Sequence, residues 1–116
     1  MPTITSEEAA NNVWVVTPSG RVDAALAPAL EAALESQLGQ GHALLVLDFT
    51  SVSYVASSGL KALLSARRKI KQAGGELALA GLSPAVFGIL EVTGLHRLFP
   101  LYASRSEAVA ALAALA

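Results

Sequence analysis

The chain has 116 residues and a net charge of −1, and 53% of its residues are hydrophobic but only 5% are aromatic. That length suits a single domain over residues 1–116, and the weak charge provides no field that would draw the chain to nucleic acid or to an anionic membrane. Because the sequence contains no cysteine, disulfide bonds, thiolate nucleophiles and cysteine-ligated metals are excluded. The N-terminus lacks the basic and apolar parts of a signal peptide, and no apolar run is long enough to insert into a membrane, so we expect a cytoplasmic protein.

The first third of the chain predicts a strand pair followed by a helix. A weak strand near residues 3–5 and a β-branched run at residues 13–17 flank an Asn-Asn pair at 11–12, which favours a hairpin turn. Leucines at helical spacing then predict a helix over about residues 26–39. Pro28 limits how early that helix begins, because proline clashes with the preceding turn of a helix.

The rest of the chain alternates predicted strands and helices. In chain order, we expect a strand at 43–47, a helix from 58 to about 73, a strand at 76–80, a helix at 84–93, a strand at 98–102 and a C-terminal helix after Ser104. The strand at 43–47 is apolar throughout, which is typical of a central strand buried on both faces. Ser83 and Ser104 occupy positions that favour helix N-caps. This alternation predicts an α/β fold with one mixed sheet and helices packed on it.

The sequence contains few of the residue arrangements that enzymes use for catalysis. His42 and His96 are the two histidines, and neither has a second ligand at metal-binding spacing, so we expect both at the surface near element boundaries and no metal site. No nucleophile elbow or phosphate-binding glycine loop occurs. Asp23 and Asp48 would suit an acid–base pair, but both sit where the chain turns away from a strand, and capping explains a carboxylate there. We therefore expect a protein that is not an enzyme.

A basic cluster invites comparison with nucleic-acid-binding proteins. Its members are Arg67, Arg68, Lys69 and Lys71. They lie in the last turns of a predicted helix, where cations interact favourably with the helix dipole. Because no aromatic residues are interleaved with them and the overall balance is acidic, the pattern favours a solvated helix face, and we expect no nucleic-acid partner.

Two hydroxyls and a glycine, Ser57, Ser58 and Gly59, open the second predicted helix directly after buried strand structure. The simplest interpretation is an N-cap, since serine is a favoured capping residue. A second interpretation is a phosphorylation site, because a phosphate at a helix N-terminus would meet free backbone N–H groups and the positive end of the dipole. Such a phosphate would add about two negative charges to a surface loop without unfolding the structure beneath it.

The segment around these serines resembles the signature of the anti-sigma-factor antagonists, a group of STAS domains. The matching positions are Asp48, Val52, Tyr54, Ser57, Ser58, Gly59 and Leu60. Gly20 and Asp23 match a turn that precedes the signature in this family, and matching segments at 74–77, 82–86 and 93–99 follow it in order. The resemblance covers essentially the whole chain. It implies the STAS-type fold, a small mixed sheet of about four or five strands packed with about four helices.

The resemblance also implies a mechanism. In this family the unphosphorylated antagonist binds an anti-sigma factor that is also an ATP-dependent serine kinase, and thereby releases a sigma factor. The kinase phosphorylates the first serine of the motif, and a PP2C-type phosphatase removes the phosphate. At the matching positions of this chain, the resemblance implies that Ser57 is the phosphorylated residue. It also implies a partner-binding surface that contains Asp23, Tyr54, Ser58, Gly59 and Leu60. A Cβ at Gly59 is expected to weaken partner binding more than folding. ATP belongs to the kinase, so this chain needs no cofactor.

One position departs from the family pattern. The acidic residue that precedes the acceptor serine is replaced by Ala56. The alternative is therefore a STAS subunit that is not phosphorylated, such as the small cytoplasmic component of an ABC-type lipid transporter. Ser57 and Ser58 favour the antagonist, whereas Ala56 and the small proportion of charged residues, 15%, leave the transporter subunit open.

Overall fold

A computed structural model describes residues 3–116 and shows one main sheet of five strands. In spatial order these are β1 (Ile4–Ala10), β2 (Val13–Pro18), β4 (Leu44–Asp48), β6 (Glu76–Ala80) and β7 (Leu101–Tyr102). β1 pairs with β2 in the antiparallel sense, and the other neighbouring pairs are parallel. The expected α/β fold with a mixed sheet is therefore confirmed.

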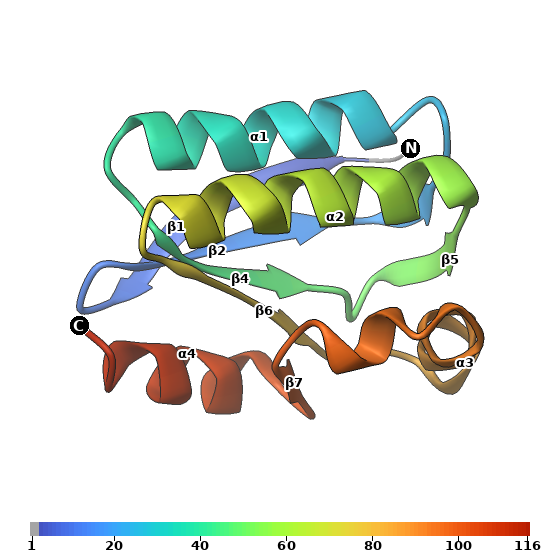
Figure 1. Cartoon of the computed structure of the whole chain (residues 1–116). Helices are drawn as coiled ribbons and strands as arrows, with labels where there is room; N and C mark the ends of the chain where they lie inside the picture. Colours follow the sequence, from blue (N-terminus) through green and yellow to red (C-terminus); the bar gives the residue numbers. More distant parts are fainter. Residues whose placement is uncertain (1–2) are drawn as a thin grey trace.

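Four α-helices surround this sheet: α1 (Ala27–Gly39), α2 (Ser57–Gln72), α3 (Pro84–Thr93) and α4 (Arg105–Ala113). Figure 1 shows α1 and α2 side by side on one face of the sheet and α4 on the opposite face. α3 lies at one end of the molecule and continues into the 3-10 helix η1 (Leu95–Arg97) (Figure 1). Within residues 3–116, none of the helices combines the length and the apolar character needed to cross a membrane.

A second, two-stranded sheet was not predicted from the sequence. It consists of β3 (Gly20–Val22) and β5 (Val52–Val55), which pair in parallel. Both strands are too short to show a clear alternation of apolar and polar residues. This small sheet positions α2, because β5 is separated from that helix by a single residue.

Two hydrophobic cores lie on the two faces of the main sheet. The larger core packs α1, α2 and α3 against the sheet and includes the buried rings of Phe49 and Phe99. The smaller core lies under α4, where Ala108 and Leu112 contact valines and alanines of the strands. Aliphatic residues and alanine therefore form most of both cores, in agreement with the composition.

The predicted elements are confirmed in the centre of the fold and need correction near the C-terminus. β4 lies between β2 and β6, as expected for the apolar run at 43–47. Asn11 and Asn12 have positive φ angles of 45° and 65° and form the hairpin turn. The last strand, predicted at 98–102, is present but shorter, as β7 at Leu101–Tyr102. It starts late because the N–H of Leu98 closes the η1 turn and Pro100 has no N–H to donate to a sheet.

The predicted caps of α3 and α4 are confirmed. The Oγ of Ser83 accepts a hydrogen bond from the N–H of Val86, and the Oγ of Ser104 accepts one from the N–H of Glu107, both at 3.2 Å. Each bond satisfies a backbone donor that has no acceptor within its helix. These two helix starts are therefore stabilised locally by their own sequence.

Candidate functional site

The candidate site is the junction at which β5 ends and α2 begins. Ala56 is the N-cap residue of α2 and has an extended backbone, with φ −84° and ψ 172°. Its N–H donates a 2.9 Å hydrogen bond to the carbonyl of Val22 in β3, and its carbonyl accepts a 3.0 Å bond from the N–H of Leu60. The small sheet therefore fixes both the position and the direction of the α2 N-terminus.

Ser57 and Ser58 are the first two residues of α2, and neither is its N-cap. The N-cap interpretation is therefore wrong, because the capping position belongs to Ala56, which has no side-chain oxygen to accept a hydrogen bond. Ser57 is exposed and Ser58 is half-buried. The first N–H groups of a helix have no acceptor within the helix, so the Ser57 hydroxyl lies beside backbone donors at the positive end of the dipole.

Gly59 is buried inside the fold. A Cβ at this position would lie 2.7 Å from the carbonyl oxygen of Val22 and 2.9 Å from the Cγ1 atoms of Val22 and Val55. The expectation that Gly59 belongs to the partner-binding surface is therefore corrected. A glycine is required here because the first turn of α2 packs directly on the backbone of β3.

Asp23 and Tyr54 lie on the two strand ends next to this junction. The Oδ1 of Asp23 accepts hydrogen bonds from the N–H groups of Ala25 and Leu26, at 3.1 and 3.2 Å, and stabilises the turn that leads into α1. Tyr54 is 38% exposed, and the guanidinium carbon of Arg21 lies 4.4 Å from the centre of its ring, a cation–π contact. The Asp23 carboxylate thus mainly accepts hydrogen bonds from the backbone. The side chains of Tyr54 and Arg21, by contrast, are exposed and available to a partner.

An open groove of about 350 Å³ runs between α1 and α2, starting near Ser58. It is lined by Ala24, Ala27, Pro28, Glu31, Ser58, Lys61, Ala62 and Ser65. Inside it, the hydroxyl of Ser65 donates a 2.6 Å hydrogen bond to Glu31. Leu60 is half-buried and packs against the larger core, so it contributes only part of its side chain to the surface.

The basic cluster of α2 is mostly paired within the chain. The Nζ of Lys69 lies 3.1 Å from a carboxylate oxygen of Glu35, and that of Lys71 lies 3.2 Å from one of Glu76. The Nε of Arg67 donates a 2.7 Å hydrogen bond to a backbone carbonyl. These contacts agree with a solvated helix face.

The two histidines lie near element boundaries, as expected, and both are half-buried instead of fully exposed. The ring of His42 stacks on Trp14 with centroids 4.3 Å apart, and its Nδ1 lies 2.7 Å from the Oε1 of Gln37. His96 packs edge-on against Phe87 at 5.9 Å. Within residues 3–116, no cluster of three or more histidine or carboxylate side chains is placed to hold a metal ion.

Asp48 belongs to an ion-pair network that holds α4 on the sheet. Arg105 donates from Nε to Asp48 at 2.9 Å, from Nη1 to Glu7 at 2.6 Å and from Nη2 to the Oγ1 of Thr17 at 2.8 Å. Burial acts to raise the pKa of Asp48, but hydrogen bonds from Thr50 and Arg105 and the charge of Arg105 outweigh it, so the pKa lies below its ordinary value. The carboxylate therefore has a structural role.

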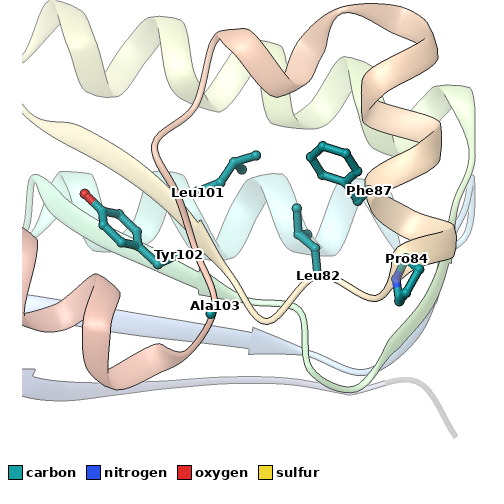
Figure 2. Close-up of a pocket in the computed structure, with 6 residues that line it drawn as sticks. All are labelled: Leu82, Pro84, Phe87, Leu101, Tyr102 and Ala103. Atoms are coloured by element: carbon teal, nitrogen blue, oxygen red, sulfur yellow. The ribbon is translucent and has the colours of Figure 1, made fainter.

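A separate apolar pocket of about 380 Å³ lies between α3 and β7 (Figure 2). Leu82, Phe87 and Leu101 approach it from three different segments, and Pro84, Tyr102 and Ala103 complete its lining. None of these residues belongs to the β5–α2 junction. The pocket is therefore distinct from the candidate site.

Comparison with known proteins identifies the family. The model of the STAS domain matches residues 6–108, which is most of the chain. The chain belongs to the STAS domain family. It is 38% identical over 92 residues to BtrV of Bordetella bronchiseptica, with 79% of each chain covered. It is 39% identical over 77 residues to an anti-sigma-B factor antagonist of Listeria monocytogenes, covering 66% of this chain and 68% of that one.

A solved relative extends the comparison to three dimensions. The crystal structure of an anti-sigma factor antagonist from Mycobacterium paratuberculosis superimposes on this STAS domain with a TM-score of 0.86 and 32% identity, covering 97% of this chain and 94% of the other. The resemblance inferred from the sequence motif is therefore confirmed. The contribution of Arg21 was not predicted, because a cation–π contact between neighbouring strands leaves no pattern along the chain. The β3–β5 pairing was not predicted because both strands are short.

Proposed function

We propose that this STAS domain, as a single domain over residues 1–116, is an anti-sigma factor antagonist that acts by binding and not by catalysis. Its partner is a cytoplasmic anti-sigma factor that is also a serine kinase, and binding releases a sigma factor. Phosphorylation of Ser57 ends this binding, and a PP2C-type phosphatase restores it. The proposed surface consists of Ser57, Asp23, Tyr54, Ser58 and Leu60, and it excludes the buried Gly59.

The observation that carries this proposal is the exposed Ser57 hydroxyl at the first position of α2, in a chain similar to named anti-sigma factor antagonists. A phosphate there would add about −1.5 to −2 charges next to the positive end of a helix dipole. Because Ser57 is already exposed, the phosphate needs no rearrangement of the fold. A partner surface that contacts a neutral hydroxyl would have to desolvate the new charge, which is costly.

Ala56 is compatible with this switch. The N-cap residue Ala56 makes no side-chain cap, so no carboxylate at position 56 competes for the first backbone N–H groups of α2. A phosphate on Ser57 would find these donors available, and hydrogen bonds to a charged acceptor are stronger than neutral ones. The loss of the family's acidic residue thus leaves an anion-accepting helix end in place.

The experiment is to incubate the wild-type chain, Ser57→Ala and Ser58→Ala with the kinase partner and ATP, and to locate phosphate by mass spectrometry. We expect phosphate on the wild type and on Ser58→Ala, and none on Ser57→Ala. Phosphate on Ser58 alone would contradict the assignment. No phosphate on any chain, together with unchanged binding by Ser57→Asp, would favour the transporter-subunit alternative.

A further inference from the structure

The exposed side of α2 forms a stripe that begins at Ser57. Lys61, Leu64 and Arg68 follow four, seven and eleven positions later, and this spacing places all four residues on one side of the helix. We call these four residues the α2 stripe. Each of them is exposed, including Leu64 at 38%.

The cations of the α2 stripe differ from the other cations of the same helix. Arg67, Lys69 and Lys71 each contact an acceptor in the chain. Lys61 and Arg68 make no ion pair and no side-chain hydrogen bond within residues 3–116. An exposed leucine between two unpaired cations is complementary to a surface on which acidic residues flank an apolar one.

The spacing of Ser57 and Lys61 suits an ion pair within α2. Side chains four positions apart on a helix have Cβ atoms about 5–6 Å apart, and the pair is more favourable when the anion is on the N-terminal side. A phosphate on Ser57 would meet this condition, with Lys61 as the cation. Lys61 also lines the groove between α1 and α2, together with Ser58, so this residue borders the candidate site.

We propose that Lys61 binds a carboxylate of the anti-sigma factor, and that a phosphate on Ser57 withdraws Lys61 from it by forming an ion pair within α2. This inference rests on the proposed function. The partner segment is acidic, and an apolar side chain in it rests on Leu64. Phosphorylation then weakens binding in two ways, because it places a phosphate in the contact that must be desolvated and removes a cation that the partner needs.

A double-mutant cycle tests this mechanism. Calorimetry measures the affinity of the wild-type chain, Ser57→Asp, Lys61→Met and the double variant for the purified anti-sigma factor that the wild type binds. Methionine keeps a long apolar side chain and a high helix propensity. We expect Lys61→Met to weaken binding about tenfold or more, since it removes a charge-assisted hydrogen bond. Ser57→Asp should then lower affinity by a smaller factor in the Lys61→Met background than in the wild type.

Lys69→Met is the matched control, because it removes the same charge from the same helix outside the α2 stripe. We expect its affinity to stay within about twofold of the wild type, since exposed ion pairs contribute little. The inference is overturned if Lys61→Met binds like Lys69→Met, or if Ser57→Asp lowers affinity by equal factors in both backgrounds. If the wild-type chain binds no anti-sigma factor, the proposed function itself fails, so the two failures are distinguishable.

A measurement without the partner tests the ion pair directly. In chains that carry phosphoserine at position 57, ³¹P NMR follows the titration of the phosphate with pH. The charge of Lys61 favours the dianion, so the phosphate of the wild-type chain should titrate at lower pH than that of Lys61→Met. Identical titrations in the two chains would overturn capture of Lys61 by the phosphate.

Discussion

The starts of α2 and α4 are similar in sequence and different in structure. Each contains two serines, Ser57 and Ser58 in one and Ser104 and Ser106 in the other. At α4, the Ser104 hydroxyl caps the helix and Arg105 donates to three side chains of the sheet. At α2, the N-cap residue Ala56 provides no side-chain cap, and Ser57 is exposed. Polar groups at the start of α4 thus stabilise the fold, whereas those at α2 remain available to a partner.

The α2 start is held in place by packing instead of by a cap. Gly59 allows the first turn of α2 to approach the carbonyl of Val22, and Ala56 donates a hydrogen bond to the same carbonyl. This arrangement keeps the exposed serine in a defined position without using its hydroxyl. Substitutions that affect packing, ion pairs and caps should therefore separate the two helix starts.

The largest effect on folding is expected at Gly59. In Gly59→Ala, the new Cβ would lie 2.7 Å from a backbone oxygen that cannot easily move, so we expect the free energy of unfolding to fall by about 2 kcal/mol. Gly88→Ala is the control, because its Cβ meets nothing within 4 Å and alanine favours a helix over glycine. Urea denaturation measures both. Equal stability of the two variants would show that α2 does not depend on this close approach.

A smaller loss is expected when the α4 network is broken. Arg105→Met leaves the buried carboxylate of Asp48 without its cation, and we expect a loss of about 1–2 kcal/mol. This value is below that of a fully buried pair, because the Arg105 side chain is 37% exposed and solvent screens it. Lys71→Met, which breaks an exposed pair, should cost less than about 0.5 kcal/mol. If Arg105→Met lost as little stability as Lys71→Met, the proposed role of the network in holding α4 would be contradicted.

The same network predicts a pH dependence. The pKa of Asp48 is lower in the folded chain than in the unfolded chain, so its contribution to stability is fully present above the unfolded value of about 3.9. It is lost as the pH falls from there through the folded value. In Arg105→Met the pKa of Asp48 should rise, and this acid-dependent loss should shrink. Thermal unfolding between about pH 2 and pH 6 would measure the difference.

The smallest effects distinguish the two serines most directly. Ser104→Ala removes a cap and should destabilise the chain by about 1 kcal/mol. Ser57→Ala should change stability by less than about 0.5 kcal/mol, because an exposed side chain outside a cap contributes little. Thermal denaturation of the two alanine variants is the measurement. A loss in Ser57→Ala that equals the loss in Ser104→Ala would mean that Ser57 stabilises α2 after all.

Sequence patterns predicted the parts of this molecule that depend on neighbours along the chain. The apolar run at 43–47, the Asn-Asn turn and the caps at Ser83 and Ser104 all follow from local propensity or periodicity. The burial of Gly59 did not, because it depends on the backbone of β3, which lies more than 30 residues earlier in the chain. For the same reason the partners of Arg105, on three different strands, were not predicted.

The most direct test of the α2 start as a switch is to measure affinity and stability of Ser57→Asp together. We expect the dissociation constant for the anti-sigma factor to rise by about 100-fold or more, since a new charge must be desolvated in the contact. The Tm should stay within roughly 2 °C of the wild type, because a carboxylate is tolerated at a helix N-terminus. Ser58→Asp should weaken binding less. Unchanged affinity in a folded Ser57→Asp chain, or a loss of affinity that merely follows a loss of folding, would contradict the account.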